Sequence, residues 1–162
     1  MSTKNIIFTC AIILLSLTSC LKSGLDRVEN SDLKEITGIS FEYRWIAKNA
    51  NGYDVLCKQA LTLSNNKATN TTADSVFTKL TVPAASTSTA FSAFNAGIRQ
   101  NVGRDSLYLI ANLSPAAKIE PIEGAPVLGL PGDFSGDSYR YKVTAANGTT
   151  KIYTIVITDF VK

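Results

Sequence analysis

Hydrophobic and polar residues alternate most regularly in residues 138–161, near the end of the chain. Tyr141 and Val143 fall on one face of an extended segment, whereas Lys142 falls on the other. This period of two is typical of a half-buried β-strand. In residues 153–158 both alternating sets are largely apolar, so we expect this second segment to lie inside a sheet.

The turn between these two segments contains Asn147 and Gly148. A two-residue turn would put the apolar faces on opposite sides of the sheet, because a slip of one residue reverses every side chain. A three-residue loop over 146–148, with Gly148 in the left-handed region as a bulge, keeps the faces matched. The sequence therefore predicts this loop, with Tyr141 opposite Tyr153.

Earlier segments also alternate, and turn-forming residues separate them. The apolar positions are Ile39, Phe41, Tyr43 and Trp45, then Tyr53, Val55, Cys57, Leu61 and Leu63, then Val76, Leu80 and Val82, and finally Leu107, Leu109 and Ala111. Each pattern predicts a strand. Because residues 49–52 form a turn, we expect the first two strands to make a hairpin.

Two connecting segments lack this alternation. Residues 84–103 are rich in Ala, Ser and Thr and predict a long loop that can hold one short helix. Residues 115–132 carry repeated Pro and Gly with apolar residues between them, which favours an extended crossover packed along the domain. Short strands with one long crossing predict an all-β fold: a single antiparallel Greek-key, immunoglobulin-like sandwich over 36–162.

The first residues have the three-part layout of a secretory signal. Lys4 precedes the apolar run 6–17, which is too short for a comfortable membrane span of about 20 residues. Cys20 follows Leu17, Thr18 and Ser19, a sequence that resembles the lipobox of bacterial lipoproteins. We therefore predict a signal peptide over 1–19, a lipidated Cys20 followed by a tether over 20–35, and attachment to the outer membrane, on a face that the sequence leaves open.

Composition and charge limit the number of domains and the kinds of partner that we expect. Without the signal peptide about 140 residues remain, enough for one domain with a buried core. The whole chain has 16 basic and 13 acidic side chains, and these are scattered singly. Because no basic stripe is available to follow phosphates, we do not expect nucleic acid as a partner. Cys57 has no disulfide partner once Cys10 is removed and Cys20 is lipidated, so we expect it to be a small buried residue.

The chain contains no histidine, which removes the usual nucleophilic triads and the common transition-metal ligand sets. Carboxylate chemistry remains, and the close carboxylate pairs are Glu120 with Glu123 and Asp133 with Asp137. Both pairs lie among Pro and Gly residues, where acidic side chains commonly serve turns. Asp133, Ser135 and Asp137 match no known calcium loop. We therefore expect no enzyme activity, no cofactor and no metal site.

The long connections 84–103 and 120–137 are the expected place for binding residues. The candidates are Trp45, Phe91, Phe94, Asp133 and Phe134. Trp45 lies near the end of its strand and is the member of its aromatic row that we expect to be exposed. These residues favour a non-catalytic envelope module that binds a glycan or a partner protein. The alternative is a structural spacer or a pilin-like subunit that completes its sheet with a strand from another chain.

Several stretches together are similar to a known family. They are the hairpin sequence 141–157, Cys20 to Leu25, Phe41 to Trp45, and Ala117 to Ser135. Together they resemble Bacteroidota lipoproteins of the domain of unknown function 5018 group. This resemblance implies a β-sandwich lipoprotein of the cell envelope and supplies no catalytic residues.

Two short sequences resemble the O-glycosylation sites of Bacteroidota proteins, in which Asp precedes a Ser or Thr that is followed by an aliphatic residue. They are Asp74-Ser75-Val76 and Asp105-Ser106-Leu107. The resemblance implies Ser75 and Ser106 as acceptors of sugar.

Overall fold

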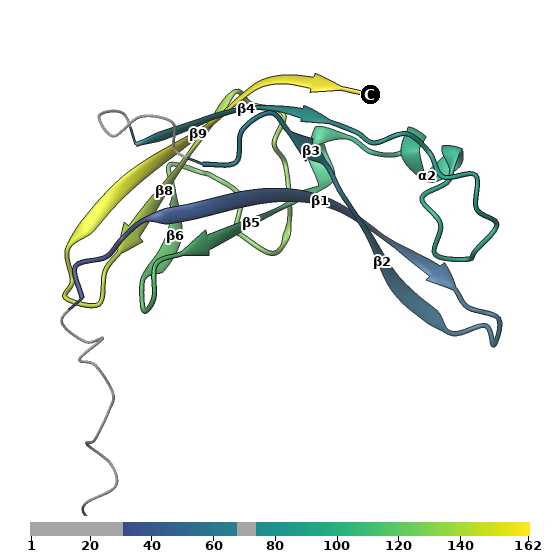
Figure 1. The fold of residues 1–162 in the computed structure, drawn as a ribbon, viewed down its shortest axis with the longest axis horizontal. Coiled ribbons are helices and arrows are strands. Elements are labelled where there is room, and N and C mark those ends of the chain that lie inside the picture. The colour runs from purple at the N-terminus through teal and green to yellow at the C-terminus, as the bar shows by residue number, and fades with distance from the viewer. Residues whose placement is uncertain (1–30, 68–73) are drawn as a thin grey trace, which may run out of the picture.

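Nine strands make up about half of the computed structural model, which describes residues 31–67 and 74–162 (Figure 1). The strands are β1 (Ile36–Lys48), β2 (Asp54–Ala60), β3 (Thr62–Leu63), β4 (Ser75–Thr81), β5 (Leu107–Leu113), β6 (Lys118–Ile122), β7 (Pro131–Gly132), β8 (Ser138–Thr144) and β9 (Thr150–Val161). The helix α2 (Ala96–Gln100) and the short 3-10 helix η2 (Arg104–Ser106) lie between β4 and β5.

The strands form two sheets. Sheet A has the order β2-β1-β5-β7, and sheet B has the order β3-β4-β9-β8-β6. The prediction of an all-β sandwich is confirmed. One pair departs from the antiparallel pattern, because β4 and β9 run parallel. Parallel neighbours need a long connection. Between β4 and β9 the chain forms β5 and β7 of sheet A and β6 and β8 of sheet B.

The core lies between the sheets and is built by the alternating positions that the sequence marks. Phe41, Leu109, Val76, Tyr141 and Tyr153 are all fully buried. Cys57 is buried, as predicted, and has no disulfide partner among the described residues. Burying a large apolar side chain contributes about 1.5–3 kcal/mol, so this layer supplies much of the stability.

The terminal hairpin has the predicted register. Tyr141 lies opposite Tyr153, and the Ala145 N–H donates to the Thr149 carbonyl at 2.8 Å. The loop is the predicted three-residue one, because Gly148 has φ +84° and its N–H donates to the Ala145 carbonyl at 3.0 Å. β9 lies between β4 and β8, which confirms that the last strand is inside a sheet.

The two connecting segments carry more structure than their patterns show. In the first, α2 is the short helix, and the Asn95 side chain caps it by accepting a hydrogen bond from the Ile98 N–H at 3.0 Å. In the second, residues 118–122 form β6 at the edge of sheet B. Pro121 is tolerated there because an edge strand needs hydrogen bonds on one side only.

Candidate functional site

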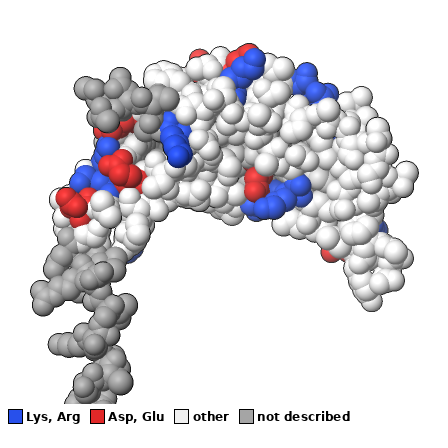
Figure 2. Space-filling model, in the orientation of Figure 1, with Lys and Arg blue, Asp and Glu red and all other residues white. Residues whose placement is uncertain are grey.

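The outward face of sheet A, meaning the face turned away from sheet B, carries both charged and apolar side chains. Because Phe41 on β1 and Leu109 on β5 point into the core, the alternate residues Glu42, Ile46 and Tyr108 lie on the opposite face. Sheet A curves, so that the lower side of the molecule in Figure 1 is concave. Figure 2 shows this side as a hollow with a small group of acidic and basic side chains near its middle.

Glu42 is a nearly buried carboxylate near the middle of this face. Its side chain is only 9% exposed, and both oxygens are paired, with Arg44 at 3.0 Å and with Lys58 at 3.2 Å. The Arg44 guanidinium also lies 4.4 Å from the ring centre of Tyr108. A shielded carboxylate is tolerated because each of its two oxygens has a charged donor. The cluster therefore fixes β1, β2 and β5 relative to one another.

Exposed apolar side chains flank this cluster. Ile46 and Leu56 lie directly opposite each other on β1 and β2, and their exposed fractions are 61% and 60%. Val127 and Leu130 are exposed at the other edge, where the Gly129 N–H donates to the Leu109 carbonyl at 2.9 Å. Ile46 and Leu56 share the outward face, and neighbouring exposed aliphatic groups of this kind are typical of an interaction surface.

Three of the aromatic residues predicted to bind a ligand pack against other aromatic rings, and two of them, Phe94 and Phe134, are buried. Phe134 is fully buried and packs edge-on against Phe41, with 5.1 Å between the ring centres. Phe94 is buried, and its ring centre lies 5.8 Å from that of Trp45. Trp45 itself is partly buried and stacks on Tyr43, because it shares the core-facing side of β1 with Phe41. The rings of Phe94 and Phe134 are covered by the protein and offer no open platform to a sugar, whereas the Trp45 ring is covered in part.

The other two predicted residues remain on the surface. Phe91 is 49% exposed in the loop before α2. Asp133 is exposed, and its side chain accepts a hydrogen bond from the Ser135 N–H at 2.8 Å. The hydrogen bonds from Ser135 lower the pKa of Asp133 below its ordinary value. Arg104, which sequence reasoning missed, closes this loop by donating to the carbonyls of Phe134 and Gly136.

The carboxylates of Glu120 and Glu123 have partners on β8. Glu120 pairs with Lys142 at 2.6 Å, and Glu123 pairs with Arg140. The hollow beside Glu123 has a volume of about 150 Å³, which is small compared with ligand sites of roughly 300 Å³ or more. Within residues 31–67 and 74–162, no cluster of three or more His, Cys, Asp and Glu side chains could hold a metal ion.

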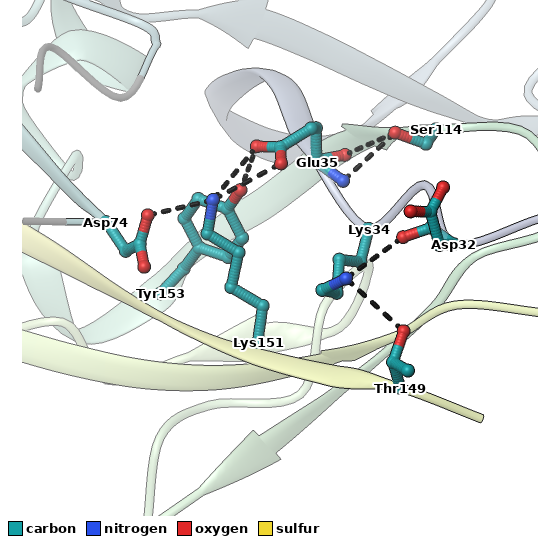
Figure 3. Close-up of polar contacts among 8 residues, drawn as sticks. All are labelled: Asp32, Lys34, Glu35, Asp74, Ser114, Thr149, Lys151 and Tyr153. Atoms are coloured by element: carbon teal, nitrogen blue, oxygen red, sulfur yellow. Dashed lines mark hydrogen bonds and ion pairs between the residues drawn. The ribbon is translucent and has the colours of Figure 1, made fainter. Parts of the chain in front are cut away.

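A second polar cluster joins the start of the domain to its last strand, which we call the entry cluster (Figure 3). It consists of Glu35, Asp74, Ser114, Lys151 and Tyr153. The Tyr153 hydroxyl and the Lys151 ammonium both donate to the Glu35 carboxylate, and Lys151 also pairs with Asp74 at 2.8 Å. The Glu35 N–H donates to the Ser114 hydroxyl at 3.0 Å, and the Ser114 N–H donates to the Glu35 carbonyl at 2.9 Å. The chain is thus fixed before β1 begins.

The electrostatics of the entry cluster follow from these contacts. The hydrogen bond from Tyr153 lowers the pKa of Glu35 below its ordinary value, and burial opposes this effect. The hydrogen bond to Asp74 raises the pKa of Lys151. Burial, followed by the bond to Glu35, raises the pKa of Tyr153. The charged forms of Glu35 and Lys151 are therefore the stable ones at neutral pH.

Residues just before Glu35 also contact the terminal hairpin. The Asn147 N–H donates to the Ser31 carbonyl at 3.1 Å, and the Lys34 ammonium donates to the Thr149 hydroxyl at 3.2 Å. The last part of the predicted tether is therefore docked on the domain. Cys20 and the signal peptide lie outside the described residues.

The predicted sugar acceptors occupy different settings. Ser75 is the first residue of β4 and pairs in register with Thr154. Ser106 ends η2, and its hydroxyl donates to the Asp105 carboxylate at 3.4 Å. Both are partly buried, and their modification remains a prediction.

Comparison with known proteins adds a family and a solved relative. The family described as DUF5018-related matches residues 36–156. A crystal structure of a Bacteroides fragilis protein that has been assigned as secreted is similar, with a TM-score of 0.68 and 28% identity. The match covers 83% of this chain and 99% of that one. A search of curated proteins finds no match. None of the described helices is long and apolar enough to cross a membrane.

Proposed function

Because this chain belongs to the DUF5018-related family, we propose that it is a non-catalytic lipoprotein of the cell envelope that binds a partner protein. The family is one of unknown function, and the similar Bacteroides fragilis protein, which is assigned as secreted, supports a location outside the cytoplasm. The proposal has two parts, a lipid anchor at Cys20 and a binding surface on the outward face of sheet A.

The anchor is supported by the position of Cys20 after the apolar run. More than one acyl chain is needed for stable attachment, and lipoproteins carry more than one. The segment from Cys20 to Ser31 can reach at most about 40 Å, so the domain stays close to the outer membrane. In Figure 1 the start of β1 and the β1–β2 hairpin lie at opposite ends of the long axis. A tether at one end leaves the hairpin free to meet a partner.

The observation that carries the binding proposal is the exposed pair Ile46 and Leu56 on the concave face. Aliphatic side chains suit an apolar patch on a protein, whereas sugars stack on exposed aromatic rings. The rings of Trp45, Phe94 and Phe134 are packed against the protein, which favours a protein partner over a glycan. The paired charges of Glu42 supply a polar centre within an apolar rim.

Binding is tested with the full-length protein and two matched variants. Ile46→Ser removes an exposed apolar group from the proposed face, and Phe77→Ser removes one that is 50% exposed on sheet B. We expect one envelope protein to copurify with the wild type and with Phe77→Ser, and to be lost with Ile46→Ser. Binding that is equal in all three proteins, or binding to a glycan array alone, would contradict the proposal.

The anchor is tested separately by feeding cells with labelled palmitate. We expect the label to enter the wild-type protein and to be absent from Cys20→Ala, while the domain folds in both. Labelling of Cys20→Ala, or no labelling of the wild type, would remove the lipid anchor and leave the binding surface to be judged on its own.

A further inference from the structure

The edges of the two sheets are unequal. Within the described residues, β3 and β7 are edge strands of two residues each, and β6 carries Pro121. Short strands and proline discourage pairing with another chain. β2 is different, because it has seven residues, contains no proline and pairs with β1 alone. β2 is therefore the long open edge of this domain.

The hydrogen bonds of the hairpin show which backbone groups of β2 face outward. The Asn49 N–H donates to the Tyr53 carbonyl at 3.0 Å, and the Leu61 N–H donates to the Phe41 carbonyl at 2.8 Å. In an antiparallel ladder the bonded pairs alternate. Between these two bonds, residues 55, 57 and 59 are therefore bonded to β1. The N–H and carbonyl groups of residues 54, 56 and 58 face the open edge.

We propose that two copies of this chain pair through β2, antiparallel, about a twofold axis at Leu56. Leu56 then lies opposite Leu56 of the partner subunit, and Asp54 lies opposite Lys58 of the partner subunit. The twofold axis repeats this ion pair at the other end. All three residue pairs use the backbone groups that face outward, so the two strands form a continuous ladder.

The charges select this register. Asp54 and Lys58 are largely exposed, with side-chain exposures of 64% and 67%. A shift of two residues would place Asp54 opposite Leu56 or Ala60 of the partner subunit and would lose both ion pairs. Asp54 keeps Lys48 beside it on β1, at 2.7 Å. The aspartate then lies between two cations, a cross-strand arrangement that stabilises a sheet.

The apolar side chains are consistent with the same axis. Ile46 and Leu56, which are 61% and 60% exposed in the single copy, form one row across four strands with the same residues of the partner subunit, and the two Leu56 side chains meet at its centre. A twofold interface is self-complementary and closes after two copies, so the open edge does not lead to fibres. An axis perpendicular to the sheet keeps both Ser31 ends on the same side, as attachment to one membrane requires. Only this last point rests on the proposed anchor. The strand pairing itself does not depend on the proposed function, since a dimer can form whether or not another protein binds.

Disulfide trapping in the full-length protein tests the pairing. Cα atoms in a bonded antiparallel pair are about 5.5 Å apart, within the range of a disulfide. Leu56→Cys, combined with Cys57→Ala, should give a covalent dimer under mild oxidation. Ile46→Cys with Cys57→Ala is the matched control, because three strand spacings, about 14 Å, separate the two copies of residue 46. A monomeric Leu56→Cys variant, or equal trapping of both variants, would overturn the proposal.

Charge reversal tests the register. In the trapping variant, Lys58→Glu places two acidic side chains opposite each other, and Asp54→Lys does the same with two lysines. Each alone should reduce trapping severalfold. A mixture of the two should restore it, because every facing pair in the mixed dimer is of opposite charge. Failure of the mixture to exceed either variant alone would rule out this register. A dimer that still forms when no envelope protein copurifies would support the pairing even if the proposed function is wrong.

Discussion

The hydroxyl of Tyr153, on the last strand, donates a hydrogen bond to the carboxylate of Glu35, the residue before the first strand. This contact joins the two ends of the domain. We expect Tyr153→Phe to lower the free energy of unfolding by about 1 kcal/mol, because the carboxylate loses a donor while the ring still fills its place. Tyr53→Phe is the control, since Tyr53 is 69% exposed and should have no effect. Urea unfolding measures both, and equal stability of all three proteins would contradict the role of this bond.

The lowered pKa of Glu35 predicts that the stability of the protein depends on pH. Its pKa is lower in the folded protein than its ordinary value of 4.5, so its contribution to stability is present above that pH and is lost as the pH falls through the folded-state pKa. We expect Glu35→Gln to be less stable than the wild type at neutral pH, and the difference to shrink below pH 4.5. Urea unfolding of the two proteins over this range tests the sign. If the difference in stability between the two proteins stays constant down to acid pH, the charge of the Glu35 carboxylate does not contribute to stability.

The left-handed turn residue gives a third prediction. Gly148 has φ +84°, where a β-branched residue is strained by about 1–2 kcal/mol. Gly148→Val should lower the melting temperature. Gly97→Ala lies in α2, where its φ is ordinary, and should leave the melting temperature unchanged or raise it. Unchanged melting of Gly148→Val would contradict the turn.

Phe134 and Phe91 should differ in how much each contributes to stability, because Phe134 is buried in the core and Phe91 is exposed. Phe134→Ala should cost about 3–5 kcal/mol of stability, because it opens a cavity between the sheets. Phe91→Ala should cost less than about 1 kcal/mol, as is usual for an exposed side chain. Thermal unfolding compares them. A stable Phe134→Ala variant would return this ring to the list of ligand-binding candidates.

Local patterns in the sequence predict much of this fold. The register of the last hairpin follows from the face of Tyr141 and the conformation that Gly148 allows, and both are local properties. The β1–β2 hairpin follows in the same way from alternation and a turn. The parallel pairing of β4 with β9 could not be predicted, because it depends on how the chain crosses between the sheets.

The site was harder to predict because it depends on what covers each face. Alternation correctly groups Trp45 with Phe41, but it does not show that Phe94, from a distant loop, packs on Trp45. Phe134 lies in a segment rich in Pro and Gly, where no period marks a buried position. Glu35 and Lys151 meet only after folding, and no motif joins them.

Photo-crosslinking in intact cells tests the central claim most directly. A photoreactive residue at position 46 reports on the outward face of sheet A, and one at position 77 reports on sheet B. We predict a discrete adduct between the full-length protein and a second envelope protein from position 46, and none from position 77. No adduct from position 46, or the same adducts from both positions, would contradict the account.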